Sequence, residues 1–118
     1  MKEIFIDGIK YVPADSIATA KSIDGMPYCI IRTYSAGVHA GYVESRTGKE
    51  VVLRNSRRIW KWAGAFTLSE LSKNGTSDPD GCKFSTVIDK ITLTEAIEII
   101  NCTETARQSI EGVEEYEY

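Results

Sequence analysis

The sequence predicts an α+β fold that is mainly β: a small antiparallel barrel or sandwich, built as a meander, with two or three short helices. Short runs of β-forming residues follow one another from residue 28 onward, and turn residues separate them. Two later segments begin with a threonine that suits a helix N-terminus. The length of 118 residues and the apolar fraction of 42% fit one domain with a thin core.

The N-terminal segment is expected to form a hairpin and a short helix. Apolar residues alternate on both sides of Asp7-Gly8, which is a strong hairpin signal. Asp15 is placed to cap a helix that runs to residue 23. We therefore divide the single domain, residues 1–118, into an added segment (1–27), a core (28–112) and an acidic tail (113–118).

The meander opens the core. Four strands are expected, over residues 28–34, 38–46, 49–54 and 57–62. Gly41 interrupts the second strand and is expected to mark a bulge. Asn55-Ser56 has the composition of a turn and is expected to separate the third strand from the fourth.

The second half of the core mixes helices and strands. Thr67 and Glu70 form a capping box, which predicts a short helix that ends at Asn74-Gly75. Two more strands are expected over residues 83–88 and 90–100. Glu95 breaks the apolar row of the second of these strands and suggests a bulge or an edge position. Thr103 is expected to cap a last helix that runs to residue 111.

The charges are unevenly distributed along the chain. The net charge is −3, which disfavours a general nucleic-acid binder and makes duplex DNA an unlikely partner. Residues 28–65 hold seven Lys or Arg and two Glu, whereas residues 95–118 hold seven Glu and one Arg. Two interpretations follow: two solvated faces that attract each other within the fold or between subunits, or a basic concave surface that receives an anion.

No catalytic, metal or cofactor site is expected. The three cysteines lack the C-x-x-C spacing of a zinc site, and His39 is the only histidine. No nucleophile elbow or phosphate loop is present, so a non-enzymatic protein is expected. There is neither a signal peptide nor an apolar run of membrane-spanning length, which predicts a location away from membranes.

One segment, residues 54–62, combines four cations with both tryptophans. On a strand, Arg58, Trp60 and Trp62 would share one face, and one of the two faces must meet the core. Arginine offers a planar fork for phosphate oxygens, and indole offers a surface for base stacking. The expected ligand-binding residues are Arg54, Arg57, Arg58, Trp60 and Trp62, extended by Arg32 and Tyr34 of the first meander strand. The other interpretation makes the tryptophans core anchors and pairs the arginines with the acidic C-terminus.

A resemblance to a known family covers about residues 28–110 and is carried by three stretches. They are residues 28–41, residues 52–65 with Leu68, Ser69 and Leu71, which include the unusual Arg-Arg-Ile-Trp-Lys-Trp run, and residues 97–104. The sequence resembles a family of small uncharacterised phage and prophage proteins. The resemblance implies a gene of phage origin that acts in the bacterial cytoplasm or in the virion, and it supplies no catalytic residue.

Three functions remain open at this stage. The leading hypothesis is a non-enzymatic protein that sequesters an anionic, nucleotide-like ligand, such as a host immune signal, as an anti-defence sponge. This hypothesis expects a homo-oligomer, because small folds often complete a pocket across an interface. The second is a structural or protein-interaction module of a phage assembly, or a host-protein inhibitor. The third is single-stranded nucleic-acid binding.

Overall fold

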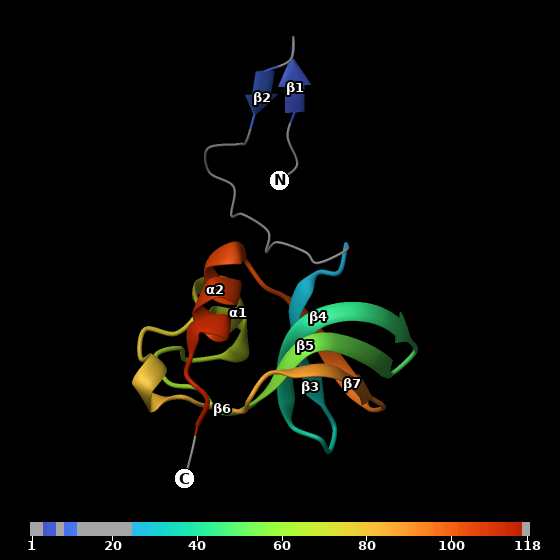
Figure 1. The fold of residues 1–118 in the computed structure, drawn as a ribbon, viewed down its shortest axis with the longest axis vertical. Helices are drawn as coiled ribbons and strands as arrows, with labels where there is room; N and C mark the ends of the chain where they lie inside the picture. The colour runs from blue at the N-terminus through green and yellow to red at the C-terminus, as the bar shows by residue number, and fades with distance from the viewer. Residues whose placement is uncertain (1–3, 7–8, 12–24, 117–118) are drawn as a thin grey trace.

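The computed structural model describes residues 4–6, 9–11 and 25–116, with side chains from residue 25 onward. In chain order the elements are β1 (Ile4–Ile6), β2 (Ile9–Tyr11), β3 (Tyr28–Thr33), β4 (Val38–Thr47), β5 (Glu50–Lys61), α1 (Leu68–Asn74), the 3₁₀ helix η1 (Pro79–Gly81), β6 (Lys83–Phe84), β7 (Ile88–Leu93), β8 (Ala96–Asn101) and α2 (Glu104–Gly112). The fold is mainly β with two helices, as the sequence predicts (Figure 1).

Six strands form one antiparallel sheet. Its order is β6-β5-β4-β3-β8, and β7 pairs with the part of β5 that β6 leaves free. The 12-residue strand β5 organises this sheet, because it pairs with β4 along one edge and with both β6 and β7 along the other. Among the strands that the structure describes, β8 pairs with β3 alone and forms an edge.

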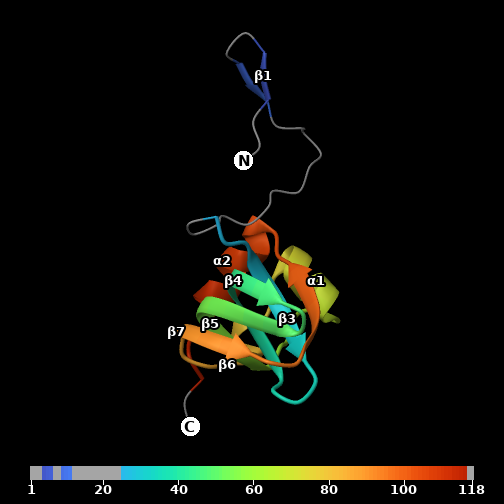
Figure 2. The same cartoon turned by 90° about the vertical axis from the view of Figure 1, so that its right-hand side faces the viewer.

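The sheet is strongly curled, because the consecutive strands β7 and β8 lie at opposite edges of it (Figure 2). Only Thr94 and Glu95 connect them. Within residues 25–116, no pairing joins β7 to β8, so the sheet stays open and the expected barrel is not confirmed. The expected sandwich is not seen either, since these strands belong to a single sheet.

Two apolar clusters lie on the two faces of the sheet. Successive residues of a strand point to opposite faces. Accordingly, Tyr28 and Ile30 pack with residues of α1 and α2, whereas Cys29 and Ile31 belong to the second cluster. That second cluster draws residues from β3, β5, β7 and β8, so the curl of the sheet encloses it. The helices cover the outer face, and the inner face forms a concave surface.

A β-bulge replaces the turn expected at Asn55-Ser56. β5 runs through this position without a break, and the pairing with β4 shifts register between Ala40 and Tyr42. Asn55 has a φ of 48°, in the left-handed region that asparagine tolerates better than most residues. Asn55 does adopt a backbone conformation that is typical of turns, but here it bends the strand instead of ending it. The bulge expected at Gly41 is confirmed at this same place.

The two strands expected after residue 82 are instead three. β6 ends at Phe84, and the paired structure resumes only at Ile88. Glu95 lies in the corner between β7 and β8, directly before the edge strand β8, and the register of β8 against β3 shifts between Ala96 and Glu98. The Glu95 carbonyl accepts a hydrogen bond of 2.9 Å from the N–H of Tyr34.

Both predicted helix caps of the core are confirmed. The Thr67 hydroxyl accepts the N–H of Glu70 at 3.1 Å, and Gly75 closes α1 with a φ of 76°. The Thr103 hydroxyl accepts the N–H of Ala106 at 3.1 Å, and α2 buries Ala106 and Ile110 as expected. The sequence signals for these helices were specific because they depend only on neighbouring residues.

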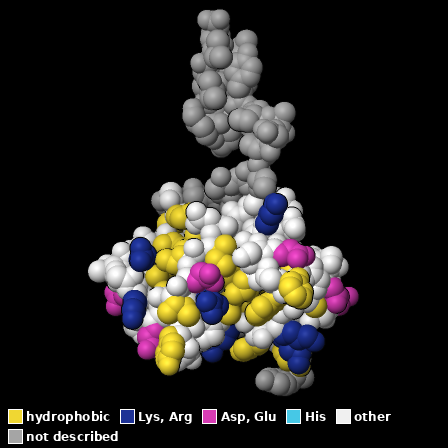
Figure 3. Space-filling model, turned by 180° about the vertical axis from the view of Figure 1, so that it is seen from behind, with side chains coloured by type: hydrophobic (Ala, Val, Ile, Leu, Met, Phe, Trp, Pro, Cys, Tyr) yellow, Lys and Arg dark blue, Asp and Glu magenta, His cyan; other side chains and the backbone are white. Residues whose placement is uncertain are grey.

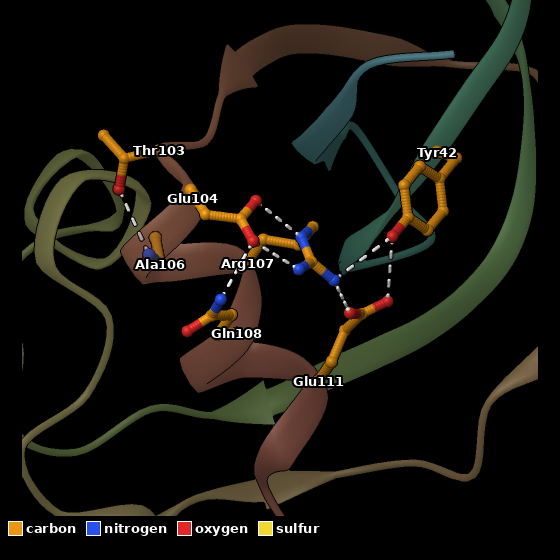
Figure 4. A network of polar contacts seen from close by, with 7 residues as sticks. All are labelled: Tyr42, Thr103, Glu104, Ala106, Arg107, Gln108 and Glu111. Carbon is orange, nitrogen blue, oxygen red and sulfur yellow. Dashed lines mark hydrogen bonds and ion pairs between the residues drawn. The ribbon is translucent and has the colours of Figure 1, made fainter. Parts of the chain in front are cut away.

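A polar network fastens α2 to the sheet (Figure 4). The guanidinium of Arg107 contacts the carboxylates of Glu104 and Glu111. The Tyr42 hydroxyl, from β4, donates to Glu111 at 3.2 Å and accepts from Arg107 at 3.4 Å. These ionic partners raise the pKa of Arg107 above its usual value, and its hydrogen bonds to Glu104 contribute most. This network is satisfied internally and has a structural role.

The two ends of the chain meet the expectations in part. β1 and β2 pair as an antiparallel hairpin, with Ile6 opposite Ile9. The short helix expected over residues 15–23 lies outside the described residues. At the other end, the acidic tail lies alongside β6. The N–H of Tyr116 donates to the Phe84 carbonyl at 2.9 Å, and the Lys83 ammonium lies 4.9 Å from the Tyr116 ring centroid.

Candidate ligand-binding site

A pocket of about 210 Å³ lies on the concave face of the sheet, at the C-terminal half of β5. β4 and β5 supply one side of it, and β7 with the segment that precedes it supplies the other. The lining residues are His39, Ser56, Arg57, Arg58, Trp60, Ser85, Thr86, Ile88 and Ile91. Ligand pockets of this kind combine an apolar lining with a few fixed polar groups.

Strand geometry brings the polar residues of this pocket together. Arg58 and Trp60 are two residues apart and therefore share one face of β5. His39 lies directly opposite Arg58 on β4. Directly opposite residues of an antiparallel pair have neighbouring side chains on the same face. The pocket thus gathers a guanidinium, an indole and an imidazole at one end of the concave face.

Arg58 is positioned by its backbone and keeps its guanidinium available. Its N–H donates to the Ser85 hydroxyl at 2.7 Å, and its carbonyl accepts the Ser85 N–H at 2.8 Å. In the part of the chain that the structure describes, its guanidinium has no hydrogen-bonding or ionic partner. The neighbouring indole of Trp60 is 53% exposed. A cation and an aromatic plane are therefore both open to a ligand.

Arg57 belongs to the interior. It is 4% exposed, and its guanidinium donates to the carbonyls of Ser85, Ile110 and Val113 at 2.9, 3.0 and 2.7 Å. It also lies over the Phe84 ring, 5.3 Å from the centroid. Burial lowers the pKa of Arg57 from its usual value. Arg57 thus joins β5 to the end of α2, and its carbonyl partners leave it little capacity to bind a ligand.

The remaining candidates lie outside the pocket. Arg54 pairs with Glu44 at 3.2 Å, and Arg32 pairs with Glu98 at 3.0 Å. Tyr34 is 79% exposed at the end of β3. Trp62 packs against the cluster under the helices, although strict alternation would place it with Trp60. β5 ends at Lys61, and a register shift against β6 lies between Ile59 and Lys61, so the alternation does not extend to Trp62.

Six of the lining residues are not among the predicted ligand-binding residues: His39, Ser56, Ser85, Thr86, Ile88 and Ile91. The sequence indicates no role for His39 and places Ser56 in a turn. His39 is 2% exposed, and its Nε2–H donates to the Ala36 carbonyl at 3.0 Å. Burial is the main cause that lowers the pKa of His39, so the ring is neutral at pH 7. The cross-strand register that places both residues in the pocket depends on the bulge, and composition does not reveal it.

The lining of the pocket offers a cation, an aromatic plane and apolar walls. Arg58 suits an anionic group, Trp60 suits a planar one, and Ile88 and Ile91 add apolar walls. Within residues 4–6, 9–11 and 25–116, no group of three or more His, Cys, Asp or Glu could hold a metal ion. The described helices include none that is both long and apolar enough to cross a membrane.

Residues 26–110 match the model of a domain family of unknown function, DUF6948, and the chain belongs to that family. No curated protein and no solved structure matches the chain. The family description carries no activity, so the phage origin inferred from the resemblance stays a prediction.

Proposed function

We propose that this protein is a non-enzymatic binding module that captures an anionic ligand with a planar, base-like body. Trp60 stacks on the planar part, and Arg58 binds the anionic part. A nucleotide-type signal of host immunity fits this description, with the protein acting as a phage-encoded sponge in the bacterial cytoplasm. A homo-oligomer is the form that we propose for it.

One observation carries this proposal: among the arginines of β5, Arg58 alone has a guanidinium without a partner in the described part of the chain, and it lies beside an exposed indole. Arg54 has an acidic partner and Arg57 has carbonyl partners. A free arginine gives charge-assisted hydrogen bonds to phosphate oxygens, and an exposed indole gives stacking of about 1–3 kcal/mol per base. Both side chains line the pocket.

Calorimetric titration with cyclic mononucleotides, cyclic dinucleotides and single-stranded oligonucleotides tests the proposal. We expect at least one cyclic nucleotide to bind, and the Arg58→Met/Trp60→Leu variant to lose that binding. The bound probe, recovered after denaturation of the protein, is expected to be chemically unchanged. Preference for the oligonucleotides, with a steep loss of affinity in salt, would favour the nucleic-acid alternative.

The chain offers a matched control. Arg32 and Tyr34 have the same spacing as Arg58 and Trp60 but lie outside the pocket. The Arg32→Met/Tyr34→Leu variant is therefore expected to bind as the unmodified protein does. Equal losses in the two double variants, or no binding of any probe by the unmodified protein, would contradict the proposal.

A second candidate function, protein interaction, rests on the edge strand β8. Among the described strands its outer edge is unpaired, and Ile97 on it is 49% exposed. Hydrophobic side chains gather on the face of the molecule where β8 and α1 lie (Figure 3). Edge strands of this kind pair readily with a strand of another chain.

We propose a second copy of the chain as the first partner to test. Light scattering is expected to give the mass of a dimer or larger oligomer, and Ile97→Lys is expected to reduce it to the monomer. Val87→Lys is the control, because Val87 has the same exposure of 49% but lies outside the strands. A monomeric unmodified protein would exclude this use of β8.

A further inference from the structure

Ser56 carries a buried hydroxyl without a partner. It is 1% exposed, it lines the pocket, and its Oγ is the single buried side-chain oxygen or nitrogen without a hydrogen bond among the described residues. Buried polar groups are nearly always hydrogen-bonded, so each exception needs an explanation. An unpaired buried hydroxyl destabilises the unliganded fold.

The local backbone holds Ser56 at this position. Asn55, with its φ of 48°, forms the bulge that turns Ser56 toward β4. Ser56 packs there against Gly41, where even a Cβ atom would come within 2.7 Å of the Ser56 Cβ. The hydroxyl thus lies in a region built around glycine and a left-handed asparagine, which is an arrangement that packing alone does not require.

His39 adds a second polar atom on the same face. Ser56 and Arg58 are two residues apart on β5, and His39 is opposite Arg58, so Ser56 is a diagonal neighbour of His39. Because the Nε2–H of His39 donates to the Ala36 carbonyl, Nδ1 carries a lone pair. The pocket floor therefore offers an acceptor from His39 and a hydroxyl from Ser56 that can donate or accept.

We infer that this floor recognises the hydrogen-bonding edge of a nucleobase, with Ser56 as the residue that determines specificity. A base edge presents a donor beside an acceptor: the donor meets His39 Nδ1, and the acceptor receives the Ser56 O–H. Arg58 then binds the phosphate at the mouth of the pocket and Trp60 stacks on the base. This inference rests on the proposed function and narrows its ligand from any planar anion to a nucleotide.

Calorimetric titration with nucleoside 5′-monophosphates, cyclic nucleotides and phenyl phosphate tests the inference. Phenyl phosphate is planar and anionic but lacks a base edge. The unmodified protein is expected to bind its best nucleotide roughly tenfold or more tightly than phenyl phosphate. Ser56→Ala is expected to weaken nucleotide binding roughly five- to tenfold and to leave the affinity for phenyl phosphate unchanged.

The melting temperature provides an independent measurement. Ser56→Ala removes the unpaired hydroxyl, so the unliganded variant is expected to melt at the same temperature or higher while it binds nucleotides more weakly. Ser56→Cys, which keeps the shape and has a weak donor, is expected to bind with intermediate affinity.

The outcomes separate the two proposals. If nucleotides and phenyl phosphate bind equally, or if Ser56→Ala weakens both, the base-edge inference is wrong and the proposed function stands. If none of the probes binds to the unmodified protein, both are wrong. A lower melting temperature for Ser56→Ala would show that the hydroxyl stabilises the fold, and this too would overturn the inference.

Discussion

Gly41 of β4 and Ser56 of β5 lie so close together that no side chain fits between them. A Cβ on Gly41 would lie 2.7 Å from the Ser56 Cβ and 3.0 Å from its Cα. Atoms at such short distances must move apart, and one of them, the Ser56 Cα, belongs to the backbone of β5. The spacing of the two strands at the floor of the pocket thus depends on the absence of a single methyl group.

Replacement of Gly41 by alanine is therefore expected to destabilise the protein by roughly 1–3 kcal/mol, the usual cost of overpacking. It should also weaken ligand binding, because β5 must shift beneath the pocket. Urea denaturation and calorimetry measure the two effects. Gly112→Ala is the control: no atom lies within 4 Å of its Cβ position, so no loss of stability is expected there. Equal stability of both variants would contradict the close approach.

The adjacent arginines Arg57 and Arg58 are expected to differ strongly in the stability that they lose on the same substitution. Arg57→Met removes three hydrogen bonds to carbonyls, two of them buried, and is expected to cost roughly 3 kcal/mol of unfolding free energy. Arg58→Met is expected to change stability by less than about 0.5 kcal/mol, because its guanidinium has no partner among residues 25–116 to lose. Chemical denaturation of both variants makes the comparison. A large loss of stability in Arg58→Met would mean that Arg58 is a structural residue.

Stability is expected to decrease as the pH falls from 7.5 to 5.5. The pKa of His39 is lowered in the folded protein by burial, whereas the unfolded chain keeps a value near 6.5. Below that value the unfolded state binds a proton that the folded state does not, so acid favours unfolding. Denaturation at several pH values is expected to give a shallower slope for His39→Gln than for the unmodified protein. Identical slopes would exclude His39 as the cause.

The Tyr42 hydroxyl is expected to contribute about 0.5–1.5 kcal/mol by connecting β4 to α2. Tyr42→Phe removes its hydrogen bonds to Glu111 and Arg107 and keeps its edge-to-face contact with Tyr28. The free energy of unfolding, measured in urea, reports the loss. Tyr34→Phe at an exposed site is the control and should be neutral. A neutral Tyr42→Phe would show that the network in Figure 4 adds little stability.

Local signals allowed much of the fold to be predicted. The capping threonines, the strands around Tyr28 and Val38, and the bulge at Gly41 each depend on nearby residues. The error at Asn55 has a physical reason: a left-handed residue is compatible with a turn and with a bulge, and only pairing with β4 decides between them. The path of β7 and β8 depends on contacts with distant strands, which no local pattern encodes.

The candidate site could be predicted only in part for the same reason. Alternation along β5 was enough to group Arg58 with Trp60. The hydrogen bond from Arg57 to the Ile110 carbonyl joins residues that are 53 positions apart, and sequence spacing cannot reveal such a tertiary contact. Ser56 and His39 join the pocket through the register of β4 against β5, which the bulge shifts.

The corner at Thr94-Glu95 sets the order in which the chain can assemble. The outer edge of β3 stays unpaired until β8 is added. This pairing joins distant residues, since Arg32 and its partner Glu98 are 66 residues apart. During synthesis the first three meander strands can therefore form while both edges of the sheet are still uncovered. Closure of so long a loop costs chain entropy before it gains contacts, so folding on the scale of milliseconds to seconds is expected.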